Sequence, residues 1–557
     1  MRLFFFILVF SGIHFCTLLA QSAYLPFDRD YYHLLERYEI KNGEFNPSFH
    51  TGTKPYRRDK VAEFLIEYRK ETFNLTKIDS FNLDYLRQDS WEFYENKAPV
   101  SKINRGKRFY QTPSDFYFFR NETFDVHVNP VIYFQGGIES QEPVGRFRNS
   151  RGIALRGSID RKIGFYSFFT TTDVVFPSWV RDYARHKGAV PGEGFWKRYG
   201  DSGYSYFSAM GYINFQATEH IQFQMGHDRN FIGEGYRSLV LSDFSNPYPF
   251  FKINTKIWKI NFTNIWGQMN ADIITDRGFP TDGRYPQKWF TFHRLGMNFG
   301  KRLNVGLFES VMANHFDLNY LNPIIFNRWV EHQLGSPDKV MVGTDFKWNF
   351  AVRMQLYGQF VLDEFVFDEF FGTTGKGSSR NKHGVQLGCK YVDVAGINNL
   401  DLQMEYNQAR PYMYQEKFNH QSFSNYRMPL THPMGANFRE LIAKISYQPL
   451  TRLILRGTML VQNFGSDPTE EANFGGDILK NRVGSSTGLF GNFIGQGVSQ
   501  KIFMGSFQCS YMLKHNLFLD FSQTLRSMKS ETDIEDLNNS FGQLSLRLNI
   551  GRFDHHF

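Results

Sequence analysis

Few residues of this sequence have a spacing that would support catalysis or metal binding. Gly484-Ser485-Ser486-Thr487-Gly488 matches the G-x-S-x-G pattern, in which a turn between a strand and a helix holds a serine nucleophile. This stretch is rich in glycine and asparagine and no helical period follows it, so we interpret it as a surface loop. His432 and the pair His555-His556 lack the H-E-x-x-H or C-x-x-C spacing of a metal site. We therefore predict no catalytic residue, no metal and no cofactor, and we expect that the protein is not an enzyme.

Three segments instead combine charged groups, amides and aromatic rings, which are the groups that bind sugars. Carboxylates, guanidinium groups and amides pair with sugar hydroxyls, and aromatic rings cover the apolar face of a sugar. The segments are residues 226–237, 321–332 and 429–437, and the second has the pattern of a short helix. The same groups could equally pack together and plug a pore, so both interpretations stay open. The candidate glycan-binding or plug residues are Asp228, Arg229, Arg237, Asn322, Arg328, Trp329, Glu331, His332, His432 and Asn437.

The elements that position these segments follow a period of two from about residue 123 onward. In residues 400–406 apolar side chains occupy every second position, and Asp401, Gln403 and Glu405 lie between them. This alternation predicts β-strands. Charges on the second face exclude a dry sandwich core and favour a wet lumen opposite a wall that faces lipid. Leu402 is accordingly assigned to the lipid face and Gln403 to the lumen.

Short and long connections alternate along the whole region, as they do in outer-membrane barrels with short periplasmic turns and long extracellular loops. Eight short turns and nine long loops predict about eighteen antiparallel strands in one closed barrel, residues 116–557. Short turns are expected near Asp160-Arg161, Ala217 to Glu219, Asn254-Thr255, Lys301-Arg302, Asn349, Ala395 to Ile397, Pro449 to Thr451 and Lys514. Long loops are expected at about 136–149, 174–203, 226–249, 269–288, 312–341, 364–383, 409–437, 464–497 and 526–539.

The residues before the barrel have a different sequence pattern. Residues 1–20 have one positive charge, a short apolar run and a small residue before Gln21, which is typical of a secretory signal peptide. Residues 21–115 contain helical spacings, such as Val61, Phe64, Leu65 and Tyr68, and predict a small periplasmic helical region with a linker. At the other end, Phe557 resembles the terminal aromatic residue of assembled barrels, although Asp554-His555-His556 interrupts the alternation before it.

Composition agrees with a membrane barrel. Aromatic residues make up 17% of the chain, yet the mean hydropathy is only -0.42. Strands that are apolar only at alternate positions have a mean hydropathy like that of a soluble protein. Cys389 and Cys509 both belong to the apolar set of their strands, which are not neighbours, so two free thiols are expected. The net charge of +8 fits attraction to acidic glycans or an ordinary solvated surface equally well. We discount nucleic acid as a partner of an exported barrel.

The sequence resembles a known family in these same segments. The run from Asp228 to Lys252 is similar to Wzi-type capsule assembly proteins of the outer membrane. It looks most like the Bacteroidetes branch that includes the gliding motility protein RemB. The resemblance implies an eighteen-stranded barrel and a non-enzymatic, lectin-like role toward capsular polysaccharide, or in that branch a part in gliding. Further similar segments are Leu321-Asn322-Pro323, Gly343-Thr344-Asp345, Leu362-Asp363-Glu364 and Pro429 to Asn437.

We therefore expect an outer-membrane barrel that handles surface polysaccharide, with membrane lipid and the outer-membrane assembly machinery as further partners. The alternatives are a channel or transport pore, and an outer-membrane hydrolase for which no site is found. We also expect the charged groups of residues 226–249 and 312–341 to converge at the extracellular mouth. The reason is that Ile324 to Trp329 is too apolar for water and should fold inward.

Overall fold

A computed structural model of the chain describes residues 23–27, 29–71, 75–94, 110–142, 145–194, 196–271, 285–372, 376–532 and 537–557. The expected signal peptide lies outside the described residues. Within the described residues no helix is both long and apolar enough to cross a membrane.

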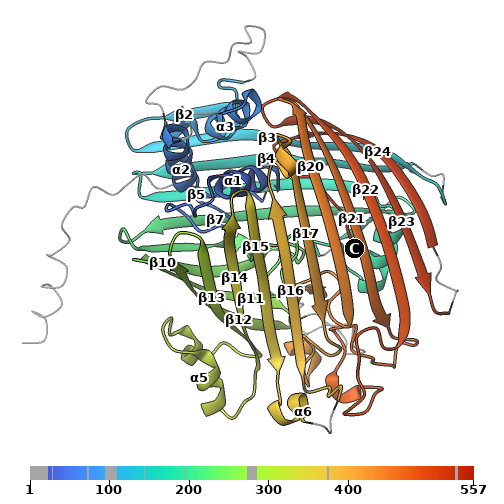
Figure 1. Ribbon diagram of the computed structural model, residues 1–557. Coiled ribbons are helices and arrows are strands. Elements are labelled where there is room, and N and C mark those ends of the chain that lie inside the picture. The colour runs from blue at the N-terminus through green and yellow to red at the C-terminus, as the bar shows by residue number, and fades with distance from the viewer. Residues whose placement is uncertain are drawn as a thin grey trace, which may run out of the picture.

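Eighteen long antiparallel strands close into one barrel (Figure 1), which confirms the predicted fold class. Each strand pairs with the next along the chain, and β24 pairs with β3 to close the ring. The first strands are β3 (Phe124–Glu139), β4 (Arg146–Ile159), β5 (Ile163–Val175), β7 (Gly203–Gln216), β8 (Ile221–Asp228), β10 (Tyr248–Ile257), β11 (Ile260–Asn270), β12 (Gln287–Phe299) and β13 (Leu303–Ala313). The others are β14 (Lys339–Ala351), β15 (Met354–Glu364), β16 (Lys382–Tyr391), β17 (Leu400–Ala409), β20 (Phe438–Leu450), β21 (Leu453–Ser466), β22 (Val498–Lys514), β23 (Leu517–Ser530) and β24 (Leu537–Leu548).

Short elements accompany the ring. Strand β2 adds to the edge of β3 beside the end of β24, and β6 adds to β7. Two further ladders, β1 with β9 and β18 with β19, are separate small sheets that do not pair with the ring. The short strands are β1 (Thr53–Lys54), β2 (Tyr117–Arg120), β6 (Lys197–Tyr199), β9 (Phe231–Ile232), β18 (Ser424–Asn425) and β19 (Met428–Pro429). The helices are α1 (Arg29–Asn42), α2 (Arg58–Glu71), α3 (Lys77–Asp89), α4 (Ser178–Lys187), α5 (Asn327–Gln333) and α6 (Phe367–Phe371), with 3-10 turns η1 (Trp91–Phe93), η2 (Leu318–Leu321), η3 (Val394–Gly396), η4 (Asn419–Gln421) and η5 (Arg482–Gly484).

Eight turns and nine loops alternate as predicted, except that the first and last loops, 140–145 and 531–536, have only six residues each and two turns were misplaced. Asn254 lies inside β10, where it pairs with Thr263 and accepts a hydrogen bond from its hydroxyl, and the turn falls at Trp258-Lys259. Asn349 likewise lies inside β14, and the turn falls at Val352-Arg353. Asparagine favours turns, but cross-strand pairing outweighs that local preference at Asn254, and at Asn349 the backbone amide donates to the carbonyl of Arg302 at 2.8 Å.

The predicted faces of the strands are confirmed. On β17, Met404 points outward and is 48% exposed, while Gln403 points inward and donates to the Tyr357 hydroxyl at 2.7 Å. Cys389 and Cys509 are free and lie on β16 and β22, with the parity of exposed Leu387 and Phe507. The outer wall is therefore apolar, as a barrel in the outer membrane requires.

Helices α1 to α3 close the end of the barrel that carries the short turns, opposite α5 and α6 (Figure 1). Arg37 of α1 forms ion pairs with Asp393, beside the β16–β17 turn, and with Asp401 on β17. Helix α3 begins with a capping box between Thr76 and Asp79, which satisfies the free amides of its first turn. Since α1 contacts the inner wall, it packs against the barrel.

Inward-folded loops fill much of the lumen with buried apolar side chains. In residues 229–247 and 410–437 the chain folds inward, and Leu239, Leu241 and Met413 are fully buried there against inner-wall side chains such as Phe290 and Phe292. The prediction of a wet lumen is thus wrong where these loops cover the inner faces of β10 to β15. The sequence around the inner-wall phenylalanines did not indicate that they are buried, because the loops that cover them are distant in sequence.

Residues 549–557 leave the wall after β24 and run through the lumen, where His556 contacts Tyr236 and Arg237. The Phe557 ring lies against Tyr183 of α4 and Phe244 of the 229–247 loop, at centroid distances of 4.8 Å and 5.6 Å. Phe557 therefore lies off the wall, as the interrupted alternation before it indicates. The polar run Asp554-His555-His556, which broke the alternation, lies in the lumen.

Candidate functional site

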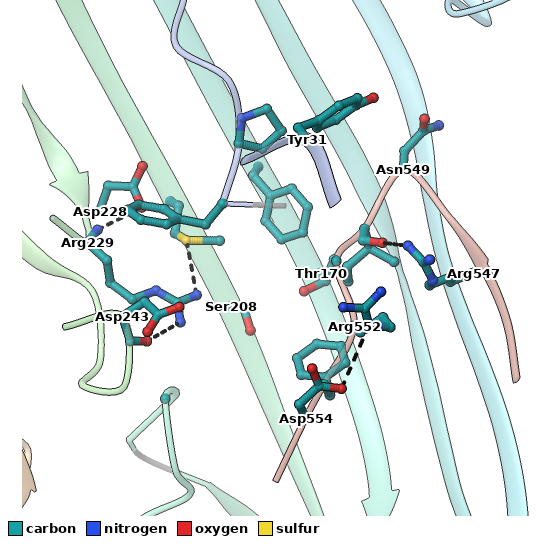
Figure 2. Close-up of a pocket in the computed structure, with 18 of the residues that line it drawn as sticks. Tyr31, Thr170, Ser208, Asp228, Arg229, Asp243, Arg547, Asn549, Arg552 and Asp554 are labelled. Atoms are coloured by element: carbon teal, nitrogen blue, oxygen red, sulfur yellow. Dashed lines mark hydrogen bonds and ion pairs between the residues drawn. The ribbon is translucent and has the colours of Figure 1, made fainter. Parts of the chain in front are cut away.

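A cavity of ≈ 270 Å³ lies inside the barrel between the inner faces of β4, β5, β7 and β8 and the segment 549–557 (Figure 2). We call it the lumenal cavity. Phe27, Tyr31 and Arg58 line it toward the helical end, and Gly192, Asp243 and Phe244 line it toward the long loops. The cavity thus reaches from the α1 region to the loops at the mouth.

Asp228 and Arg229 form one side of this cavity, where β8 ends (Figure 2). The Asp228 carboxylate accepts the Arg229 amide at 2.7 Å. The Arg229 guanidinium donates to the carbonyl of Asp243 at 3.1 Å and contacts the Met210 sulfur at 3.7 Å. Its Nε is buried without a hydrogen-bond partner. Burial also raises the pKa of nearby Glu193, which accepts a hydrogen bond from Ser208 at 2.6 Å. A guanidinium group beside a carboxylate can pair with neighbouring hydroxyl groups of a ligand.

The opposite side is formed by segment 549–557, which is fixed from the helical end. Arg552 and Arg547 both pair with Asp30 at the start of α1, at 2.6 Å and 3.1 Å. Arg456 on β21 adds a third contact to the same carboxylate at 2.5 Å. Burial opposes ionisation of Asp30, but the three arginines outweigh burial and hold its pKa well below its usual range. A charged Asp30 therefore joins α1, the wall and segment 549–557.

Three aromatic rings from separate segments meet where the cavity approaches the long loops. Tyr183 of α4, Phe244 and Phe557 lie within 6.2 Å of one another, measured between ring centroids. Phe244 and Phe557 line the cavity. We call these three residues the aromatic trio. The mouth of the cavity therefore offers ring faces beside the charged and amide groups deeper inside.

Arg237 holds the 229–247 loop across the lumen. Its guanidinium pairs with Glu440 on β20 at 3.1 Å and also donates to the carbonyl of His556. The Nε2 of His432 donates to the same Glu440 carboxylate at 2.5 Å, and His432 is fully buried. Burial lowers the pKa of His432 although Glu440 opposes the shift. A second cavity of ≈ 120 Å³ lies beyond segment 549–557, which therefore divides the free space of the lumen.

Five of the ten predicted residues lie in the lumen or at the loop bases, and of these Asp228, Arg229 and Arg237 line the lumenal cavity; the other five lie outside the wall. Asp228, Arg229, Arg237 and His432 lie in the lumen, and Asn437 donates to the carbonyls of Gly465 and Gln496 at the loop bases. The prediction that residues 312–341 fold inward is wrong. Asn322, Arg328, Trp329, Glu331 and His332 lie in the 314–338 loop, which covers the outside of the wall.

Other motifs carry no site. Ser486 lies in the 467–497 loop, and its hydroxyl accepts the Asn473 amide at 2.8 Å. His556 contacts Tyr236 and Ser506, away from His432. Across the described ranges no group of three or more His, Cys, Asp or Glu side chains is placed to hold a metal ion.

Sequence reasoning missed Asp30, Glu440, Arg552 and the aromatic trio. Glu440 had a signal, because it is a charge on the lumen face of a strand. Arg552 also had one, since the broken alternation after β24 indicates a segment that leaves the wall. Asp30 had none, because its partners lie more than four hundred residues away in sequence.

Comparison with known proteins supports the fold. No protein-family model matches the chain, and no curated protein matches it. A solved structure of Wzi, an outer membrane protein involved in group 1 capsule assembly in Escherichia coli and described as a carbohydrate-binding β-barrel, matches with a TM-score of 0.57. The match has 12% identity and covers 96% of this chain and 100% of Wzi. OprD of Pseudomonas aeruginosa matches at 8% identity and a TM-score of 0.41, over 76% of this chain and 96% of OprD. OccAB2 of Acinetobacter baumannii matches at 11% and 0.42, over 77% and 99%. At these identities the Wzi likeness shows the fold alone, that of an outer-membrane barrel.

Proposed function

We propose that this barrel binds a surface polysaccharide, without catalysis, through the lumenal cavity and the loops around it. The observation that carries the proposal is the lining of the lumenal cavity, in which Asp228 and Arg229 lie inside and Phe244 and Phe557 of the aromatic trio lie toward the mouth. Wzi, whose fold the chain shares, is described as carbohydrate-binding. The biological role that we propose is capsule or exopolysaccharide attachment, or support of gliding motility as in the RemB branch.

The lining fits a sugar chain better than a small apolar ligand. Arg229 and Asp228 offer a donor fork and a carboxylate for neighbouring hydroxyls, which a pyranose ring presents side by side. The rings of Phe244 and Phe557 offer apolar faces at the entrance. One or two sugar units of the polymer would enter the lumenal cavity, while the rest of the polymer stays outside.

The proposal includes an orientation and a route. The short turns and α1 to α3 would face the periplasm, and the long loops the cell surface. Residues 1–20 would direct export, residues 21–115 would remain periplasmic, and the outer-membrane assembly machinery would insert residues 116–557. Cysteine labelling of intact cells tests the orientation: a membrane-impermeant maleimide should label a Glu470→Cys variant and not a Lys162→Cys variant.

Arg229→Ala tests the binding site, with Arg328→Ala as a matched control from the outer wall. Purified full-length barrel should bind surface polysaccharide from its own organism at least about tenfold more weakly after Arg229→Ala, which corresponds to losing one charge-assisted contact. Arg328→Ala should bind as the unmodified chain does. Equal binding by both variants, or weakening by Arg328→Ala alone, would contradict the proposed site.

A channel remains the second candidate, because the lumenal cavity extends from the α1 region to the loops at the mouth. A pore requires a continuous aqueous path, whereas α1, the inward loops and segment 549–557 occupy this lumen. Planar-bilayer recording separates the two functions. The binding proposal predicts little conductance from the unmodified barrel, and steady open-channel currents would favour the pore.

A further inference from the structure

The 314–338 loop folds back over the outside of the barrel wall. The parity of its contacts places it there. Glu309 on β13 accepts the amides of Asn327 and Arg328 at 2.7 Å and 3.2 Å, and so holds the start of α5. Glu309 has the same parity as Leu307, which is 61% exposed on the outer face. Phe308, with the opposite parity, belongs to the core inside the lumen.

Two further contacts fix the loop on this wall. The indole of Trp266 on β11 donates to the Tyr320 carbonyl at 2.8 Å. Tyr320 itself packs with Val311 and Ala313 on β13 and with Val340 on β14. Figure 1 accordingly shows α5 beside the ring of strands, near the ends of β11 to β13.

Beneath the loop, the wall carries a polar pair that lipid would not tolerate. His293 and Glu309 approach to 3.2 Å and are both buried. Leu295 and Leu307, which pair with each other in the next outward-facing position, are exposed apolar side chains. The apolar band of the wall therefore begins directly below the pair, and the loop covers the pair where uncovered charges would face the membrane.

The loop reaches to the depth of the lipid head groups. Glu309 lies four residues before the end of β13 at Ala313, and Trp266 four before the end of β11 at Asn270. Four residues span about 13 Å along a strand, or about 10 Å along the membrane normal at the usual tilt. The interfacial layer of each leaflet is about 5–8 Å thick, so a loop folded back by about 10 Å passes alongside this layer and reaches the outer edge of the hydrocarbon.

The side chains on the far side of the loop have the chemistry of that layer. Ile324 and Trp329 are 86% and 72% exposed, and Leu318 is exposed as well. The Arg328 side chain is half exposed and pairs with Glu331 at 2.5 Å. Apolar side chains mixed with tryptophan and arginine are typical of segments that lie in the plane of the interface.

From these contacts we propose that the 314–338 loop is a membrane anchor, with its exposed apolar side chains inserted among the lipids of the outer leaflet. The lipid is favoured over a protein partner because the loop's apolar side continues the lipid-facing wall at interfacial depth. Anchoring this loop would hold β11 to β14 at a set depth and leave the mouth above them free. The inference does not depend on the polysaccharide proposal.

A fluorescent label tests the insertion. Full-length barrel carrying Cys389→Ala and Cys509→Ala would be refolded in phosphatidylcholine vesicles with a single labelled cysteine, either Trp329→Cys or the control Glu470→Cys. Glu470 is exposed in the 467–497 loop. Brominated phosphatidylcholine should reduce emission at position 329 by about twofold or more, as for an interfacial segment, and leave position 470 unchanged.

Two results would overturn the proposal. Emission at position 329 that matches the control, in both wavelength and quenching, would place the loop in water. A blue-shifted emission that brominated lipid does not quench, and that shifts back on dilution into excess lipid, would show that a second copy of the chain covers the loop. Ile324→Cys repeats the measurement if the Trp329 variant does not refold.

Discussion

Substitution of Met404 by arginine tests the orientation of the wall. Strand β17 spans ten residues, Leu400–Ala409, which gives about 33 Å along the strand and about 25 Å along the membrane normal. This matches the height of the apolar band of an outer-membrane barrel, so Met404 lies near the midplane. Arginine facing lipid at that depth costs about 2–4 kcal/mol, or roughly 30-fold to nearly a thousandfold in the folding equilibrium.

The neighbouring position supplies the control. Gln403 points into the lumen and lines the second cavity, where an arginine finds Glu36 and Asp401 among the lining residues. Gln403→Arg should therefore change the free energy of unfolding by less than about 1 kcal/mol. Leu402 also faces lipid but lies closer to the short-turn end. Leu402→Arg should therefore lower the free energy of unfolding by more than Gln403→Arg and by less than Met404→Arg.

The assay is reversible urea unfolding of the three variants in lipid vesicles, with heat-modifiable migration on gels as a check of folding. The expected order of destabilisation is Met404→Arg, then Leu402→Arg, then Gln403→Arg. Equal losses for Met404→Arg and Gln403→Arg would refute the assigned faces. A larger loss for Leu402→Arg than for Met404→Arg would refute the assigned depth.

Three further perturbations address the interior. Asp30→Ala leaves three buried arginines without their carboxylate and should destabilise the folded barrel by about 3–5 kcal/mol, measured as the shift in urea unfolding and as faster proteolysis of α1. Deleting residues 551–557 should join the two cavities and raise single-channel conductance above that of the full chain, whereas unchanged conductance would show that segment 549–557 is not the partition. His432 has a folded-state pKa below its usual value, so its stabilising contribution is complete above the unfolded pKa of about 6.5 and is lost as the pH falls. The drop in stability on acidification should therefore be smaller for His432→Gln than for the unmodified chain, compared by unfolding at neutral pH and near pH 5.

The candidate site was predictable only in part. Asp228 and Arg229 follow a strand on the long-loop side, so their place near the mouth could be deduced from the connection lengths. Arg328 and Trp329 satisfied the same rule and yet lie outside the barrel. Connection length says on which side of the membrane a loop lies, but not whether it turns toward the lumen or toward the lipid.

The sequence by itself determined the wall. The period of two, the alternation of short and long connections and the outward thiols are local properties, because each strand residue's face depends only on its parity. The contents of the lumen were decided by the tertiary structure. Leu239 and Leu241 pack against inner-wall phenylalanines, whereas Tyr320 packs against Val311 and Val340 on the outer wall. Which apolar surface a loop covers depends on residues brought together only when the barrel closes, and the path of residues 549–557 depends on Asp30 in the same way.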